Sequence, residues 1–227
     1  MQRKLESIIK EIIPPIVLRG VQAVYLSLSE KCVPQEEGAE KGPEWYDASF
    51  ENSDHWRRHY SETHYYFLWS VIVDRMIRAG VESILEVGCG TGQLACLIRD
   101  KGISRYHGFD FSPKRIDQAK RVCPEFVFSR QDAFQTDLFT TFDYDAVICT
   151  EFLEHVEGDI EVLNRIRSGA RFYGSVPNFP FPSHVRHFMS EKEVLFRYGQ
   201  CFTDIQVDAF LAKAKGKTYY LLEGIKI

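Results

Sequence analysis

The chain has 227 residues, a formal net charge of −4 and a pI near 6.0, which fits one domain with a modest extension. This charge gives no sequence-wide electrostatic case for nucleic-acid binding. No secretory signal is apparent, and no run approaches the roughly 20 apolar residues that span a bilayer. We therefore expect a cytoplasmic protein without stable membrane insertion.

Residues 1–44 are predicted to form an amphipathic helix and a linker. Apolar and polar positions alternate at helical spacing over residues 1–30, with an interruption at Pro14 and Pro15. We expect this helix to pack on the domain or on a second copy, as a homodimer contact. A helix lying on a membrane surface fits less well, because its polar face mixes acids with bases. Residues 31–44 have little to bury and indicate an exposed linker.

Residues 45–80 are predicted to form a helical segment that is unusually rich in aromatic residues. All three tryptophans lie between positions 45 and 69, interleaved with histidines and charged residues. Several of these rings must pack in a core, but an aromatic face can also hold a cation. We therefore favour a lid that covers a binding site, with Tyr46, Tyr60 and His64 facing that site. Residues 66–76 then form the helix that leads into the first strand.

A glycine-rich loop follows the first predicted strand. Residues 84–87 form a short, mostly apolar run suited to a buried parallel strand. Gly88, Gly90 and Gly92 interrupt it, and apolar residues resume at helical spacing from Leu94. The backbone N–H groups at the start of such a helix attract an anion, and glycines let a ligand approach the backbone closely.

Three further strands end in polar residues. Residues 106–109 precede Asp110, about 20 residues past the glycines, where a carboxylate can accept hydrogen bonds from ribose hydroxyls. The alternative role for Asp110 is that of a turn or helix-capping residue. Residues 126–128 form the third strand, before Asp132, and residues 144–150 form the fourth, before Glu151. We expect these strand ends to lie at one edge of the sheet.

The remainder of the chain completes an α/β pattern. We expect a helix over residues 159–167, a fifth strand over 170–176, a loop over 179–188 and a helix over 191–198, capped by Ser190. Residues 202–210 and 217–225 read as an antiparallel strand pair, which makes seven strands. The six cysteines show no paired spacing and are expected to be buried free thiols.

The loop sequence excludes two common nucleotide-binding motifs. It lacks the Gly-Lys-Ser/Thr ending of a P-loop. The dinucleotide fingerprint requires a third glycine where Gln93 stands, and Glu86 would face a pyrophosphate unfavourably. The pattern E-x-G-x-G-x-G instead resembles the cofactor loop of class I S-adenosylmethionine (SAM) methyltransferases, and the resemblance covers residues 83–227.

This resemblance implies a fold, a domain and a cofactor. The fold would be a doubly wound, mostly parallel sheet of seven strands in the order 3-2-1-4-5-7-6, with helices on both faces. The methyltransferase domain would span residues 45–227, with the aromatic lid at 45–80 and the sheet core at 83–227. SAM would be the cofactor, and the family pattern suggests contacts with Glu86, Gly88, Cys89, Gly90, Gly92, Asp110, Phe111, Asp132, Ala133, Thr150 and Tyr60.

The catalytic candidates follow the fourth and fifth strands. They are Glu151, Glu154, His155 and His184. His155 has a suitable unperturbed pKa for a base near neutrality, although it could equally orient the loop by hydrogen bonding. We expect methyl transfer to a hydroxyl or amine of a small-molecule acceptor, without nucleic acid and without a metal.

Two other functions stay open. The Glu151-x-x-Glu154-His155 spacing with a later histidine, His184 or His187, resembles the metal site of small-RNA 3′-terminal 2′-O-methyltransferases. In those enzymes two glutamates and two histidines hold Mg²⁺ or Mn²⁺. The other alternative is a SAM-binding protein that serves as a partner without activity.

Overall fold

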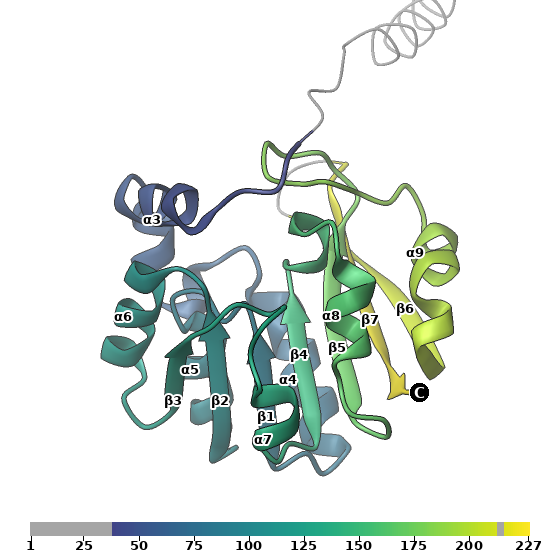
Figure 1. The fold of residues 1–227 in the computed structure, drawn as a ribbon, viewed down its shortest axis with the longest axis horizontal. Coiled ribbons are helices and arrows are strands. Elements are labelled where there is room, and N and C mark those ends of the chain that lie inside the picture. Colours follow the sequence, from purple (N-terminus) through teal and green to yellow (C-terminus); the bar gives the residue numbers. More distant parts are fainter. Residues whose placement is uncertain (1–37, 213–215) are drawn as a thin grey trace, which may run out of the picture. The chain divides into compact units, whose positions relative to one another are not determined.

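The computed structural model of the protein describes residues 38–212 and 216–227. The predicted N-terminal helix, its expected dimer contact and residues 31–37 of the predicted linker lie outside the described residues. The described part contains one seven-stranded sheet in the order β3-β2-β1-β4-β5-β7-β6 (Figure 1). This order is the one that the family resemblance implied.

The sheet is mixed rather than wholly parallel. Its parallel strands are β1 (Ser83–Val87), β2 (Arg105–Asp110), β3 (Val127–Arg130), β4 (Ala146–Thr150) and β5 (Arg171–Pro177). The strand β7 (Thr218–Lys226) pairs antiparallel with β5 and with β6 (Phe202–Leu211). The expected antiparallel strand pair at the end of the chain is therefore confirmed.

Helices cover both faces of the sheet and enclose two apolar cores. One face packs against α4 (Tyr66–Arg78), α5 (Gln93–Asp100) and α6 (Pro113–Val122). The other packs against α7 (Leu138–Thr141), α8 (Asp159–Asn164) and α9 (Glu191–Tyr198) (Figure 1). Because successive strand residues point to opposite faces, Ile84 of β1 belongs to the first core and Leu85 to the second.

The aromatic segment before β1 is built from short helices. It contains α3 (Pro43–Glu51), the 3-10 turns η1 (Asp54–Arg57) and η2 (Tyr60–Glu62), and the start of α4. Two further 3-10 turns, η3 (Leu153–His155) and η4 (Gly199–Cys201), follow β4 and α9. Figure 1 shows α3 beside α6, at the end of the sheet where the parallel strands finish.

Two local predictions are confirmed. Helix α9 spans residues 191–198 as expected, and the Ser190 hydroxyl accepts a hydrogen bond from the Glu193 N–H. The five cysteines among the described residues are buried and free: Cys89, Cys96, Cys123, Cys149 and Cys201. None of the described helices is long and apolar enough to span a membrane.

Candidate active site

A cavity of about 550 Å³ lies where β1 and β4 end. Its floor contains Glu86 and the glycine loop from β1, with Thr150 and Glu151 from β4. Its walls are largely aromatic, with contributions from the segment before β1, from the loop after β5 and from β7: Trp45, Tyr46, Trp56, Tyr65, Trp69, Phe179, Phe181 and Tyr219. Parallel α/β sheets commonly bind ligands at this edge, so the cavity is the candidate active site.

The glycine loop leaves open space for a ligand. Gly88, Gly90 and Gly92 all have positive φ angles, of 71°, 53° and 79°. At Gly90 a Cβ atom would meet nothing within 4 Å, whereas at Gly92 it would lie 3.0 Å from the Cα of Ala119 in α6. The loop therefore packs closely on α6 on one side while its backbone stays accessible on the other.

Glu86 is a buried carboxyl group at the floor of the cavity. The Tyr106 hydroxyl donates a hydrogen bond to it. Burial raises the pKa of Glu86 to about 7, an effect that this hydrogen bond opposes and the charge of Asp110 reinforces. Glu86 can therefore change charge near neutral pH, and it is placed to face a positively charged ligand.

Asp110 holds the glycine loop in place. Its two carboxylate oxygens accept hydrogen bonds from the Gly90 N–H at 3.1 Å and the Ser112 N–H at 2.8 Å. Burial raises its pKa. Asp110 thus fills the turn role that the sequence left open, while an ionised carboxylate keeps further lone pairs for a ligand.

Helix α3 covers the end of the site where the adenosine contacts were expected. The Tyr46 ring lies 5.2 Å from the Phe111 ring, and Asp47 accepts a hydrogen bond of 2.5 Å from the Ser112 hydroxyl. Of the predicted cofactor contacts, Glu86, Gly88, Cys89, Gly90 and Thr150 line the cavity. The others do not appear in its lining: Gly92, Asp110, Phe111, Asp132, Ala133 and Tyr60.

The prediction that three aromatic-segment residues face inward holds for two of them. Tyr46 and His64 line the cavity. The Tyr60 hydroxyl instead donates a hydrogen bond to Asp100 at 2.8 Å, at the surface of α5. Asp100 lies at the last turn of α5, away from the glycine loop, and its carboxylate fixes Tyr60 there.

Both histidines predicted to be catalytic, His155 and His184, present an unprotonated nitrogen. The Nδ1 of His155 lies 2.9 Å from the Ser183 carbonyl oxygen, and the Nδ1 of His184 lies 3.0 Å from that of Phe179. A carbonyl oxygen only accepts, so each Nδ1 carries the proton. Burial lowers the pKa of His155 to about 3 and that of His184 to about 4. Each neutral ring therefore keeps its Nε2 lone pair available.

Two glutamates accompany the histidines: Glu154 is buried and Glu151 is half-buried. Glu154 is completely buried, neither of its carboxylate oxygens has a hydrogen-bonding partner among the described residues, and burial holds its pKa well above the ordinary value. Its Oε1 lies 3.7 Å from the Nε2 of His155. Burial also raises the pKa of Glu151 to about 8, and the Ser175 hydroxyl donates to this carboxylate at 2.9 Å.

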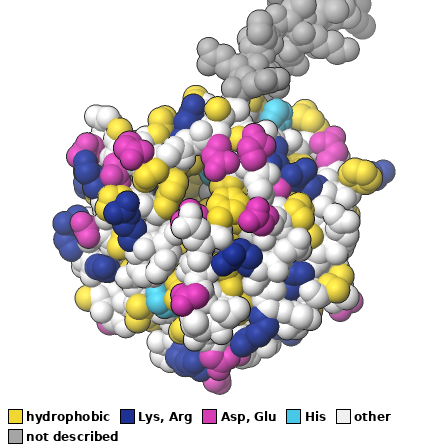
Figure 2. All heavy atoms as spheres, in the orientation of Figure 1, with side chains coloured by type: hydrophobic (Ala, Val, Ile, Leu, Met, Phe, Trp, Pro, Cys, Tyr) yellow, Lys and Arg dark blue, Asp and Glu magenta, His cyan; other side chains and the backbone are white. Residues whose placement is uncertain are grey.

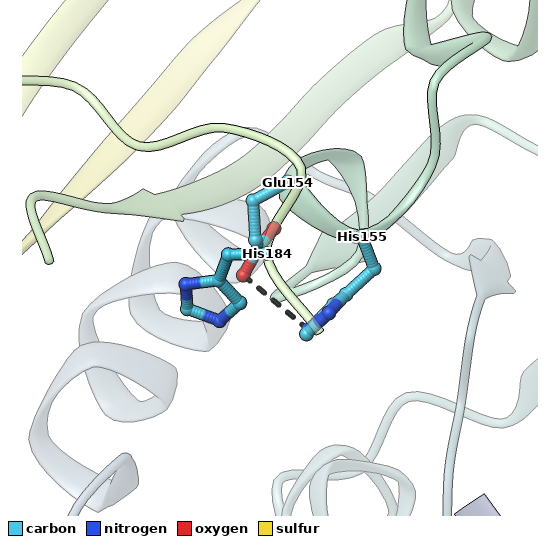
Figure 3. A group of neighbouring side chains, drawn as sticks. All are labelled: Glu154, His155 and His184. Atoms are coloured by element: carbon cyan, nitrogen blue, oxygen red, sulfur yellow. Dashed lines mark ion pairs between the residues drawn. The ribbon is translucent and has the colours of Figure 1, made fainter. Parts of the chain in front are cut away.

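Three of these side chains converge on one point. Glu154, His155 and His184 each offer a ligand atom, and those atoms all lie within 4.8 Å of one another (Figure 3). Glu154 and His155 come from the 3-10 turn η3 after β4, and His184 comes from the loop after β5. Glu151 does not belong to this group. The structure thus brings together three of the four predicted catalytic residues.

Arg115 lines the cavity although the sequence analysis did not single it out. It lies in the first turns of α6, whose sequence is rich in lysine and arginine and so suggests a solvated face. Arg115 is nevertheless buried, because α3 and η1 fold over it. No pattern in the local sequence marks that burial.

Comparisons with known proteins agree with this geometry. Residues 85–171 match the family model described as a methyltransferase domain. No curated protein sequence matches significantly. Among solved structures, magnesium protoporphyrin IX methyltransferase from Synechocystis PCC 6803, with bound SAM, is 19% identical with a TM-score of 0.61, and the match covers 84% of this chain and 100% of that one.

Two other solved structures share the fold. N-methyltransferase NodS from Bradyrhizobium japonicum WM9, in complex with S-adenosylhomocysteine (SAH), is 14% identical with a TM-score of 0.64, covering 81% of this chain and 97% of that one. The methyltransferase domain of bacterial CtHen1-C is 15% identical with a TM-score of 0.55, and the match covers 70% of this chain and 97% of that one. With this match over residues 85–171, the strand order and the glycine loop, the chain contains a methyltransferase domain and has the fold of the class I SAM-dependent methyltransferases.

Proposed function

We propose that the protein transfers a methyl group from SAM to a hydroxyl or amine of a small-molecule acceptor. The observation that carries this proposal is the cavity, because it joins an open glycine loop to two neutral histidines within aromatic walls. SAM would supply an activated methyl group on a good leaving group. The protein must then bind the cofactor, align the acceptor and accept a proton.

The residues at the end of β1 fit the methionine part of the cofactor. Glu86 offers a carboxyl group that the ammonium of SAM would hold in its ionised form. Thr91 and Trp69 each have a buried polar atom without a hydrogen-bonding partner in the described part of the chain, and both residues line the cavity. Such groups are costly to leave unpaired, so a polar ligand in the cavity would stabilise them.

His155 is the proposed base. Its Nδ1–H is fixed on the Ser183 carbonyl, which directs the unprotonated Nε2 away from the loop backbone. This arrangement suits acceptance of a proton from an acceptor hydroxyl or amine. Its low pKa limits its basicity, so His184 and Glu151, which line the same cavity, are proposed as supporting groups.

The aromatic lining of the cavity favours a small acceptor over RNA. A nucleic-acid site requires a basic surface that contacts phosphates. On the face shown in Figure 2, lysine and arginine side chains are interspersed with aspartate and glutamate. The formal net charge of −4 agrees with this distribution.

One observation favours a metal-dependent reaction, and with it RNA 3′-end methylation, as a second candidate. The cluster of Glu154, His155 and His184 combines an unpartnered buried carboxyl group with two imidazoles whose Nδ1–H groups are fixed on carbonyl oxygens. Metal-binding histidines are commonly held in this way. A carboxylate with two imidazoles suits Mn²⁺ or a similar ion.

One assay series tests both candidates. Purified protein is incubated with methyl-labelled SAM and either small-molecule extracts or RNA oligonucleotides, with and without EDTA, and the products are identified by mass spectrometry. We expect methylated small molecules and no effect of EDTA. Loss of activity with EDTA and recovery with Mn²⁺ on RNA ends would establish the second candidate instead. SAH binding without any methylated product would favour a non-catalytic partner role.

The cofactor assignment has its own measurement. Replacing Asp110 with Ala removes a buried carboxylate from the expected ribose position and should weaken SAH binding by about 2–3 kcal/mol in isothermal titration calorimetry. Asp117→Ala, at an exposed position on the same helix α6, is the control and should bind SAH like the unmodified protein. Unchanged affinity in a folded Asp110→Ala protein would remove Asp110 from the site.

A further inference from the structure

Lys217 is a half-buried cation in the wall of the cavity, directly before β7. Its ammonium nitrogen lies 4.3 Å from the centre of the Phe179 ring, and it makes no side-chain hydrogen bond and no ion pair with any described residue. A ring face stabilises the charge of an ammonium group but accepts none of its N–H groups in full hydrogen bonds. These donors are therefore available to an anionic ligand in the cavity.

Asn178, directly after β5, fixes the backbone on both sides of Lys217. Its side-chain amide donates a hydrogen bond to the Gly216 carbonyl oxygen at 3.2 Å, and its side-chain oxygen accepts one from the Thr218 N–H at 2.7 Å. The Lys217 carbonyl oxygen accepts a further hydrogen bond from the Ala212 N–H at 2.8 Å. Lys217 thus has a defined backbone position although it lies outside a regular strand.

The loop after β5 connects Lys217 to the histidines of the candidate site. The centre of the Phe179 ring lies 5.8 Å from that of His184, and the Phe179 carbonyl oxygen accepts the Nδ1–H of His184. The His184 ring centre lies 4.8 Å from that of His155, the proposed base (Figure 3). The charge of Lys217 also contributes to the lowered pKa of His184. An acceptor beside both histidines would therefore extend across Phe179 towards Lys217.

Lys217 lies on the side of the cavity away from the expected cofactor contacts. The predicted ribose and adenine contacts, Asp110 and Asp132, follow β2 and β3, which lie on one side of β1 in the sheet. Strands β4, β5 and β7 lie on the other side, and β7 is three strand positions from β1 (Figure 1). At the usual spacing between strands this separation is about 14 Å. A ligand of Lys217 is thus expected to be the acceptor.

The carboxyl groups near the histidines carry little negative charge at neutral pH. Glu151 lines the cavity, and because burial raises its pKa to about 8 it keeps its proton at pH 7. Burial also holds the pKa of Glu154, which lies beside His155, well above the ordinary value. Lys217 therefore supplies the net charge at this end of the cavity, and that charge favours an anionic acceptor.

We propose that Lys217 binds a carboxylate on the methyl acceptor, which makes the acceptor an aromatic acid with a hydroxyl or amine group. This inference rests on the proposed function and names the chemical class of its substrate. The rings of Phe179 and Tyr219, whose centres lie 5.6 Å apart, offer flat apolar surfaces beside Lys217 for the acceptor ring. A single ammonium group matches the single charge of a carboxylate. Lys217 determines which acceptor binds and takes no part in proton transfer.

The test uses pairs of ligands that differ only in the carboxylate. Hydroxy- and amino-substituted benzoates and cinnamates, and the matching carboxamides, are titrated into protein saturated with SAH, and dissociation constants are measured by ligand-observed NMR. We expect the carboxylates to bind about tenfold more tightly than their carboxamides. Lys217→Met should abolish this difference by weakening the carboxylates alone. Lys217→Arg keeps the charge and should retain most of the difference.

Lys192→Met is the matched control, because Lys192 is exposed on α9 and lies outside the cavity lining. It should bind both kinds of ligand like the unmodified protein. Equal binding of carboxylates and carboxamides, equal weakening of both by Lys217→Met, or no bound carboxylate would each overturn the inference.

The extract assay separates these failures from a failure of the proposed function. A methylated neutral product from the extract would leave the proposed function standing without an anionic acceptor. Carboxylate binding that depends on Lys217, without any methylated product, would support the anion site and overturn the proposed function.

Discussion

The protonation state of Glu86, a residue of the candidate site, affects the stability of the folded protein. Burial raises its pKa from the ordinary 4.5 to about 7. Between these values the folded protein holds a proton on Glu86 that the unfolded chain has already lost. Folding in this range is therefore coupled to proton uptake.

This coupling predicts the direction of the pH dependence of stability. The contribution of Glu86 is fully present below about pH 4.5 and is lost as the pH rises through about 7. We expect the free energy of unfolding in urea to fall between these values, by up to about 3 kcal/mol from Glu86. In Glu86→Gln, which can still accept from Tyr106, the fall should be smaller. Parallel pH profiles for the two proteins would contradict the raised pKa.

At the scale of elements, α3 covers the end of the site where the adenosine contacts are expected. It is held there by the Tyr46 ring on Phe111 and by Asp47, which accepts hydrogen bonds from the Ser112 hydroxyl and the Lys114 N–H. The Lys114 ammonium also pairs with Glu51 of the helix. These contacts close α3 over α6 where Asp110 and Phe111 would receive a ligand.

Loosening α3 is therefore expected to speed cofactor binding. Asp47→Ala removes hydrogen bonds worth about 1 kcal/mol, which corresponds to a roughly fivefold higher association rate constant if α3 must open first. Stopped-flow measurement of tryptophan fluorescence during SAH binding would follow this step, since Trp45 and Trp56 line the cavity. Asp54→Ala, at an exposed position in η1, should leave the rate unchanged. Equal rates for Asp47→Ala and the unmodified protein would mean that α3 does not limit entry.

The longer elements could be predicted from the sequence because each has a local physical signal. Buried strands such as β1 and β4 are mostly apolar runs, and α9 carries its own cap at Ser190. The four-residue helix α7 and the 3-10 turns η1 and η2 were missed, because elements this short have too few residues to show a period. Helix α8 ends at Asn164, three residues before the predicted end.

At the scale of the whole molecule, the site was predictable where it depends on strand ends. Glu86, Thr150, Glu151 and His155 line the cavity because parallel strands finish at one edge of the sheet. Arg115 and the inward position of individual rings depend on how α3 and η1 fold back over α6. Contacts between distant segments leave no local pattern, and for this reason Tyr60 was expected in the cavity and Arg115 was not.

The left-handed backbone conformation of Glu151, directly after β4, lowers the stability of the folded protein. Glu151 has a φ of 51° and Asp204, in β6, has a φ of 53°, a left-handed conformation that favours glycine. Holding a residue with a Cβ there costs about 1 kcal/mol relative to glycine, and glycine recovers only part of this because it makes the unfolded chain more flexible. The fold therefore contains two similar points of strain, one inside the cavity and one outside its lining.

These two positions should respond differently to engineering for thermostability. Glu151→Gly is expected to melt at a higher temperature than Glu151→Ala, by the equivalent of about 1 kcal/mol, yet to lose methyl transfer because the carboxyl group is gone. Asp204→Gly should be at least as stable as the unmodified protein and keep full activity. Thermal melts and turnover measured on the same samples would reveal this trade-off, and full activity in Glu151→Gly would mean that methyl transfer does not need the Glu151 carboxyl group.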